Sequence, residues 1–395
     1  MTMRRISAQY VFTSAGKPLR RAVVIASSDG EIVEVEDTGG ELKESAGTEF
    51  YNGILIPGLI NCHSHLELSY MRNVIPRGEG LAAFISNMGK RRGSGSGSET
   101  GSARVAGSGD GSMAGSGDGT TRGEVEAAAA RADGEMRDGG IVACGDISNE
   151  AVSFDVKSRS SIRYLTFVEV FGTDTLQADA RMNGALTVAE AAAESRLPAY
   201  ITPHAVYSLS DRLSTLVREH ITPGSVISLH FLESDDERKM SSDHVETALE
   251  LSRLASRLIL VHNTVITGPE AERLAREGNT WFCLCPSSNL HITGAMPPVM
   301  LLREVTDRII AGTDSLASND RLDMLAELRL LHDAAPGIPL DEIIRWGTIN
   351  GARALKMSDS LGSIEPGKKP GLLLIENADL VNLRLLPGSR VRRLL

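Results

Sequence analysis

The segment PGLINCHSHLELS, residues 57–69, places more constraint on this chain than any other. Its apolar, strand-like run ends on His63 and His65 and is followed by Glu67. Residues two apart on a strand point to the same face, so both imidazoles can reach one metal ion. A short His-x-His motif also arises by chance. Metal binding therefore requires further ligands from elsewhere in the chain.

Apolar strand-like runs alternate with helical segments from Ile54 onward, which is the signature of parallel βαβ units. Each of eight candidate strands is followed by a helical segment. The eight strands are 54–61, 141–146, 163–171, 199–204, 225–230, 257–262, 280–285 and 308–313. This pattern predicts a closed (β/α)8 TIM barrel, whose active site lies at the C-terminal ends of the strands.

Both ends of the chain have a different character from the barrel segment. Short β-type runs such as 10–13, 22–26 and 31–35 precede it, and after Lys356 the sequence SLGSIEPGKKPGLLLIE again indicates turns and a strand. We therefore predict an α/β protein in two parts. Residues 1–52 and 361–395 form a small β-sandwich domain from both chain termini, and residues 53–360 form the catalytic barrel.

A Gly/Ser-rich insertion interrupts the barrel segment over residues 91–123. Between Gly93 and Gly119, 17 of 27 residues are Gly or Ser, which leaves almost nothing apolar to bury. We predict that the insertion is disordered and connects a helix that starts near Leu81 to an alanine-rich helix over 124–136. A gating role over the active site is the alternative, although long insertions cost little stability and persist without a role.

Composition excludes several classes of protein. With 395 residues, of which 42% are hydrophobic, the chain can bury one large core. A net charge of -10 disfavours nucleic acid and anionic membranes as partners. No signal peptide and no run of eighteen apolar residues is apparent. We expect a cytoplasmic enzyme that acts on a small molecule. The sequence leaves open whether the chain forms a homo-oligomer.

The four cysteines, Cys62, Cys144, Cys283 and Cys285, lie in or beside strand-like runs. We predict buried, reduced thiols rather than a disulfide framework. The pair Cys283-x-Cys285 could contribute to a zinc site, but the chain has no second such pair.

Strand ends supply the remaining ligand candidates. Besides His63 and His65, they carry His230, His262 and Asp314. Three neutral imidazoles and a carboxylate suit one divalent metal ion, zinc or iron(II), and leave room for a water. As an alternative, Asp314 could cap a helix after Gly312 and Thr313, a role compatible with metal contact.

Glu233 is the candidate general acid and base, because it stands three residues past His230, next to a strand end. Hydrolysis of a C–N bond requires such a group to accept a proton from water and to give one to the leaving nitrogen. The alternative is a solvated loop carboxylate, since the acidic run 235–237 follows closely.

Five motifs, in this order, resemble the amidohydrolase superfamily: PGLINCHSHLE, SLHFLES, LILVHNTV, CPSSNL and AGTDSLASNDRLDM. Within this superfamily, the motifs resemble those of the branch that contains chlorohydrolases, guanine and cytosine deaminases, and adenosine-type deaminases. The resemblance implies a barrel flanked by a β-sandwich, with His63, His65, His230 and Asp314 as metal ligands. It also implies three catalytic residues: Glu233 as the proton shuttle, His262 as the residue that holds the water or polarises the target, and Asp314.

The end of the fourth predicted strand indicates how many metal ions bind. Binuclear members of the superfamily carry a carboxylated lysine there, whereas this chain has His204 in ITPHAVYSLS. The resemblance therefore implies a mononuclear site. Glu169, near the end of the third strand, is the one candidate for holding a second metal ion.

A narrower resemblance, to the aminodeoxyfutalosine deaminases of the futalosine route to menaquinone, rests on CHSHLELSYMRNVIPRGEGLAAFI and GTDSLASNDRLDMLAELRLL. It implies an adenine nucleoside that loses its 6-amino group. Glu67 would bind ribose hydroxyls, and Arg72 or Arg77 would pair with a substrate carboxylate. His204 and Asn289 would line the pocket.

Four of these five candidate substrate contacts have a structural alternative. The two arginines could be solvated loop charges, and the two pocket residues could hold loops. Guanine, cytosine, methylthio- or homocysteinyl adenosine and halogenated triazines stay open as substrates. A non-catalytic amidohydrolase-like scaffold is the alternative of another class.

Overall fold

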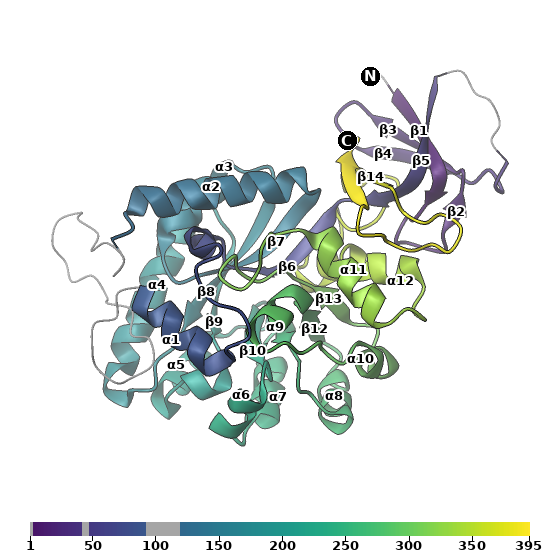
Figure 1. Cartoon of the computed structure of the whole chain (residues 1–395). Helices are drawn as coiled ribbons and strands as arrows, with labels where there is room; N and C mark the ends of the chain where they lie inside the picture. Colours follow the sequence, from purple (N-terminus) through teal and green to yellow (C-terminus); the bar gives the residue numbers. More distant parts are fainter. Residues whose placement is uncertain (1–2, 42–46, 92–118) are drawn as a thin grey trace.

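The computed structural model describes residues 3–41, 47–91 and 119–395. A barrel with helices around it forms the larger part, and a sheet that contains both chain ends lies to one side of it (Figure 1). This is the predicted α/β architecture, with the small β domain formed by both termini.

Eight parallel strands form the barrel within the described residues, in two sheets of four. They are β6 (Leu59–Ser64), β7 (Ile141–Ser148), β8 (Arg163–Val170), β9 (Ala199–Pro203), β10 (Val226–Phe231), β11 (Arg257–His262), β12 (Thr280–Leu284) and β13 (Ile309–Ala311). Residues of β10 and β12 are buried throughout, as expected for strands covered on both faces. The predicted (β/α)8 barrel is confirmed.

Two parallel bridges close the barrel by joining the two sheets. Ser64 pairs with Asp314, and Ala205 pairs with His230. At the first seam, the backbone N–H of Asp314 donates to the carbonyl of His63 at 3.0 Å. Gly312 allows this approach, because a Cβ there would stand 2.9 Å from Cβ of His63. Both seams therefore lie where the candidate ligands are.

The first predicted strand, 54–61, is wrong as a single element. Residues 54–57 end β5 (Thr48–Pro57), which belongs to the terminal sheet, and β6 starts at Leu59. The chain changes sheets at Gly58, whose N–H donates to the carbonyl of Pro370 at 3.0 Å. A Cβ at Gly58 would lie 2.5 Å from that oxygen. Apolar residues on both sides of Pro57 and Gly58 make the two strands look like one.

Helices cover the outside of the barrel (Figure 1). Those that follow β6 to β9 are α1 (Leu81–Arg91), α2 (Arg122–Asp138), α3 (Phe154–Arg159), α4 (Ala178–Glu194) and α5 (Asp211–His220), with the 3₁₀ turns η1 (Leu66–Met71), η2 (Ala151–Ser153), η3 (Thr175–Gln177) and η4 (Val206–Ser208). Those that follow β10 to β13 are α6 (Asp235–Met240), α7 (His244–Leu254), α8 (Gly268–Ala275), α9 (Pro286–Ile292), α10 (Val299–Val305), α11 (Met324–Ala334), α12 (Leu340–Trp346) and α13 (Ile349–Ala354).

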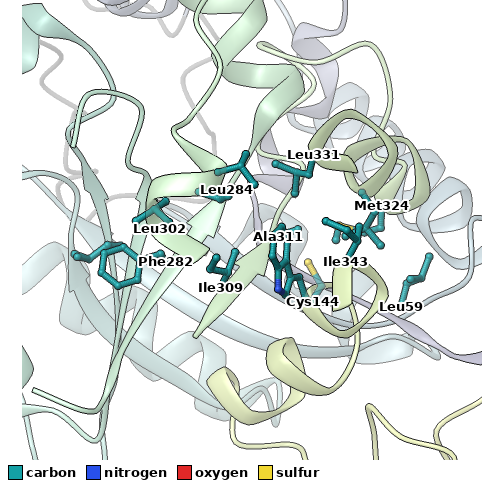
Figure 2. Close-up of a cluster of buried hydrophobic side chains, with 14 of the residues drawn as sticks. Leu59, Cys144, Phe282, Leu284, Leu302, Ile309, Ala311, Met324, Leu331 and Ile343 are labelled. Atoms are coloured by element: carbon teal, nitrogen blue, oxygen red, sulfur yellow. The ribbon is translucent and has the colours of Figure 1, made fainter. Parts of the chain in front are cut away.

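Apolar side chains fill the space between the strands and these helices. Figure 2 shows part of this core, where Phe282 and Ile309 of the barrel meet Leu302, Leu331 and Ile343 of the surrounding helices. Packing of these strands and helices removes their apolar side chains from water, and this burial is the main stabilising contribution to the fold. The four cysteines are buried and free, as predicted.

The terminal β domain is a mixed sheet, seven-stranded within the described residues, in the order β15-β14-β5-β1-β3-β4 with β2 beside β1. Its strands are β1 (Met3–Val11), β2 (Leu19–Arg20), β3 (Val23–Ser27), β4 (Ile32–Glu36), β5, β14 (Leu372–Glu376) and β15 (Arg390–Arg393). Leu372 pairs with Pro57 in β5, so the two chain ends share one sheet. The β5 strand crosses the boundary predicted between residues 52 and 53, and the domain limits stay a prediction.

Most of the predicted Gly/Ser-rich insertion, 92–118, lies outside the described residues. Its outer residues belong to helices, since Arg91 ends α1 and Arg122 starts α2. A capping box starts α2: the hydroxyl of Thr121 accepts from the N–H of Glu124, and the Glu124 carboxylate accepts in return. No helix of the described residues has the length and apolar character that crossing a bilayer requires.

Candidate active site

Histidines from two strands and an aspartate from a third strand end converge at the C-terminal end of the barrel. His63 belongs to β6, His65 follows it, His230 belongs to β10, and Asp314 follows β13. One ligand atom of each histidine lies within 4.8 Å of those of the other two. All three histidines are buried. The fold thus brings together, at the strand ends, candidate ligands that are up to 251 positions apart in the sequence.

Distances within this cluster suit a single cation. Nε2 of His63 and Nε2 of His65 are 3.1 Å apart. Oδ1 of Asp314 lies 3.5 Å from the first and 3.3 Å from the second. Imidazole nitrogens and a carboxylate oxygen that converge on one point form the donor set that zinc or iron(II) takes. The residues present therefore fit a divalent metal ion.

A backbone hydrogen bond fixes the tautomer of His230. Its Nδ1 lies 3.0 Å from the carbonyl oxygen of His204, which can only accept, so Nδ1 carries the proton. Nε2 is then left with its lone pair for a metal ion.

Glu169 and His204 lie behind His230 and form with it a second cluster of potential ligands. Nδ1 of His204 donates to Oε1 of Glu169 at 2.9 Å, and Nδ1 of His230 lies 3.5 Å from the same oxygen. Because Nδ1 of His230 already carries a proton, it cannot ligate a cation on that side. We infer that this pair orients His230, which favours one metal ion over two.

The two oxygens of Asp314 have separate partners. Oδ2 accepts from the hydroxyls of Ser288 at 2.5 Å and Ser318 at 2.7 Å, which leaves Oδ1 toward the histidines. Burial acts to raise the pKa of Asp314, but the contact with His63 and the charge of His65 outweigh it and hold the pKa well below its usual range. The carboxylate is thus ionised and oriented.

Glu233 and His262 face each other beside the ligand cluster. Oε1 of Glu233 lies 3.7 Å from Nε2 of His262, and both side chains are buried. Burial and the nearby charges of Asp314 and Glu237 raise the pKa of Glu233 well above its usual value. Burial lowers the pKa of His262 to about 4. A buried carboxyl group with a raised pKa beside an imidazole with a lowered pKa is an arrangement suited to proton transfer.

A family model described as the amidohydrolase family matches residues 54–386, most of the chain. This chain belongs to the amidohydrolase family. It is a metal-dependent enzyme of the amidohydrolase/deaminase type, which excludes the non-catalytic scaffold as its class.

Named relatives of this amidohydrolase are deaminases. A 5-methylthioadenosine/S-adenosylhomocysteine deaminase of Halobacterium salinarum is 26% identical over 378 residues, covering 90% of this chain and 79% of the relative. A protein of the same name from Teredinibacter turnerae is 32% identical over 194 residues, covering 45% and 43%.

Solved structures share the fold of this amidohydrolase. An aminofutalosine deaminase of Helicobacter pylori, in complex with methylthio-coformycin, has a TM-score of 0.71 at 20% identity over 97% of this chain and 93% of that one. An adenosine deaminase of Xanthomonas campestris with bound zinc has a TM-score of 0.71 at 24% identity, covering 96% and 86%.

The predicted substrate-binding residues occupy varied surroundings in this amidohydrolase. Glu67 is buried, and its Oε2 accepts from the backbone N–H groups of Asn149 and Glu150 at 3.0 and 3.2 Å. Arg72 pairs with Glu135 and Arg77 with Asp320, each at 2.5 Å. The two arginines thus already have carboxylate partners within the protein.

His204 and Asn289 lie close to the ligand cluster. The His204 ring is 4.5 Å from that of His230 between centroids, and its side chain is partly exposed. Asn289 is buried, and its amide nitrogen contacts Nδ1 of His262 at 3.4 Å and donates to the hydroxyl of Thr264 at 2.5 Å. Asn289 therefore contacts the His262 ring, in addition to any role in lining the pocket.

Sequence reasoning missed the residues that orient the site. Ser288 and Ser318 fix Asp314, and Asn149 donates its side-chain amide to Oε2 of Glu169 at 3.1 Å. Both serines lie inside motifs that the sequence singles out, CPSSNL and AGTDSLASND, so the signal was present there. For Asn149 no sequence signal exists, because its role depends on the loop that follows β7.

Proposed function

We propose that this amidohydrolase is a hydrolytic deaminase of an adenine-type nucleoside and releases the 6-amino group as ammonia. The observation that carries the proposal is the position of the buried Glu233 at the same barrel end as the convergent side chains of His63, His65, His230 and Asp314. A hydrolytic deaminase needs a water activated next to a group that can donate a proton to the ring.

In this proposal, His63, His65, His230 and Asp314 hold one metal ion, zinc or iron(II). When bound, a divalent cation supplies a water whose pKa is lowered from 15.7 toward about 7. Oδ1 of Asp314 would accept a hydrogen bond from that water, because Ser288 and Ser318 occupy Oδ2.

Glu233 then moves the protons. Its carboxyl group donates to the ring nitrogen next to the carbon that bears the amino group while water oxygen bonds to that carbon. One proton of the water passes through the Glu233 carboxylate to the amino group. The C–N bond breaks and ammonia leaves, while the second proton of the water returns to Glu233, so that a ring carbonyl remains. Neutral His262 donates a hydrogen bond at this centre.

For the substrate we propose aminodeoxyfutalosine, converted to futalosine plus ammonia in menaquinone biosynthesis. The resemblance over 62–85 and 312–331 supports this choice, as does the fold shared with an aminofutalosine deaminase. Buried Glu67 would bind ribose hydroxyls, and His204 would line the pocket. Either Arg72 or Arg77 would have to exchange its protein carboxylate for that of the substrate.

The second candidate is deamination of 5-methylthioadenosine or S-adenosylhomocysteine. Two observations favour it: the relatives with 26% to 32% identity described above carry that name, and both arginines are already paired. Methylthioadenosine has no carboxylate, so it would leave both ion pairs intact.

The test is product release by the metal-loaded protein from a panel of substrates: ammonia from aminodeoxyfutalosine, methylthioadenosine, S-adenosylhomocysteine, adenosine, guanine and cytosine, and chloride from a chlorinated triazine. We expect the highest kcat/KM for aminodeoxyfutalosine. A kcat/KM at least tenfold higher for methylthioadenosine would assign the second candidate. Release from guanine, cytosine or the triazine alone would refute deamination of an adenine nucleoside.

A further inference from the structure

The turn that carries Glu233 has an unfavourable backbone conformation. Leu232, between β10 and Glu233, has a φ of 49°. This left-handed conformation is uncommon for a residue with a branched side chain, and it persists only where surrounding contacts hold it. His262 and Asp314 also have positive φ values, 78° and 57°. Strained backbone therefore recurs at the strand ends that carry the site.

Glu237 holds the turn at Leu232. Its side chain is fully buried at the start of α6. Oε1 accepts from the backbone N–H of Leu232 at 2.8 Å, and Oε2 accepts from the backbone N–H of Glu233 at 2.7 Å. One carboxylate thus satisfies two successive N–H groups of the turn. Hydrogen bonds of this charge-assisted kind are stronger than those between neutral groups.

The helix that carries Glu237 is itself fixed. Ser234 caps α6 by accepting from the N–H of Glu237 at 3.2 Å. Arg238 donates to both carboxylate oxygens of Glu270, at 2.7 and 2.9 Å. On the other side of the turn, the carbonyl of Leu232 accepts from the N–H of Val265 at 3.0 Å. These contacts hold α6 in place. The Glu237 carboxylate in turn holds the turn at Leu232 in a fixed position relative to that helix.

Glu237 does not take part in the proposed proton transfers, and its burial is costly. Burial raises its pKa to about 7, against the lowering effect of the two N–H donors. Nδ1 of His244 lies farther away than these donors, at 3.8 Å from Oε1. The N–H groups of the turn are thus the closest partners of this carboxylate.

We propose that Glu237 is a positioning residue for Glu233: by clamping the two N–H groups of the strained turn, it aims the Glu233 carboxyl group at the reacting ring. The inference rests on the proposed role of Glu233. Glu237 acts through the backbone and touches neither the substrate nor the metal ligands.

The first test is Glu237→Gln, which replaces one accepting oxygen by an NH₂ group that cannot accept from an N–H. We expect kcat to fall by about 10- to 100-fold, since a misplacement of about 1 Å costs rates of this order. KM and bound metal should stay within twofold of the native values. Asp236→Asn, an exposed change on the same helix with the same loss of charge, is the matched control and should leave kcat unchanged.

A double-mutant cycle separates action through Glu233 from action on the whole site. In a Glu233→Gln background, Glu237→Gln should lower the residual kcat by less than twofold, because the group that it positions is gone. A loss equal to that in the native background overturns the proposal. Native-like turnover by Glu233→Gln alone would instead overturn the proposed function, so the two failures are distinguishable.

Amide hydrogen exchange tests the turn directly, even where residual activity is too low to measure. In Glu237→Gln, exchange at Leu232 and Glu233 should become faster while exchange at His230 stays native. Glu237→Asp, which keeps the charge but is one methylene shorter, should show a smaller increase and supplies a second variant if Glu237→Gln folds poorly. Unchanged exchange at both amides in either folded variant overturns the proposal.

Discussion

Carboxylates of the barrel end and of the terminal sheet show opposite behaviour. In the sheet, Glu49 is partly exposed and accepts two hydrogen bonds from Arg4, which lowers its pKa to about 2. At the barrel end, Glu233 is buried near other carboxylates, and burial raises its pKa. The pKa of the same type of side chain is thus lowered at the surface of one region and raised in the interior of the other.

Asp146 shows that burial alone does not make a catalytic acid. It lies at 0% exposure in β7, and Nζ of Lys157, equally buried, stands 2.5 Å from its Oδ2. Oδ1 accepts from the backbone N–H of Leu66 at 2.8 Å, next to the ligand His65. This carboxylate has a cation partner and a structural role. Glu233, buried beside the ligand cluster, instead faces His262, whose pKa is lowered to about 4.

The largest effect that the comparison predicts is on turnover. Replacing Glu233 by Gln removes the donated proton and should lower kcat by about 10²- to 10⁴-fold, the usual contribution of a general acid or base. Bound metal should stay at the native stoichiometry, because Glu233 is not a ligand. Ammonia release and elemental analysis of the purified variant check both parts. Near-normal turnover would contradict the assignment of Glu233 as the general acid and base.

The next largest effect concerns stability. Lys157→Met leaves the buried carboxylate of Asp146 without its cation and should lower the free energy of unfolding by about 3–5 kcal/mol. Urea denaturation measures the loss. Arg159→Met, on the same helix but exposed and paired with Asp155, is the control and should stay within about 0.5 kcal/mol of native. Equal stabilities for the two variants would contradict the contrast between buried and exposed pairs.

The smallest effect is expected in the sheet. Glu49→Gln should cost at most about 1 kcal/mol, because solvent screens a pair that is more than a third exposed on the Glu49 side. The folded pKa of Glu49 is depressed, so its contribution is present above the ordinary pKa of 4.5 and is lost as the pH falls toward about 2. Unfolding curves of native and variant protein should thus differ slightly at pH 7 and converge in acid. A difference that grows on acidification would refute the sign.

Much of the architecture is predictable from the sequence. Fully buried parallel strands are continuous apolar runs, so seven of the barrel strands stand where the pattern puts them. The first is misassigned, because apolar residues stand on both sides of Pro57 and Gly58 while the change of sheet depends on what surrounds Gly58. Apolar periodicity records burial, but it does not record which sheet a strand joins.

The candidate site is likewise predictable from the sequence only in part. Parallel strands bring their C-terminal ends together, so residues at strand ends, such as His63 and His230, are predictable as neighbours. Residues that orient them are not, since Ser288 reaches Asp314 only through the path of the chain between β12 and β13. Likewise, Glu237 appears in the sequence as one acid of a charged run, and its burial shows only in three dimensions.

The most direct test of the central claim, that the cluster at the barrel end is a metal-dependent deaminase site, is a metal titration of turnover. Metal-depleted protein is given zinc or iron(II) in steps, and ammonia release from the best adenine nucleoside is followed. The account predicts negligible release without metal and full activity near one equivalent per chain, with His63→Ala inactive throughout. Undiminished release from metal-depleted protein would contradict it.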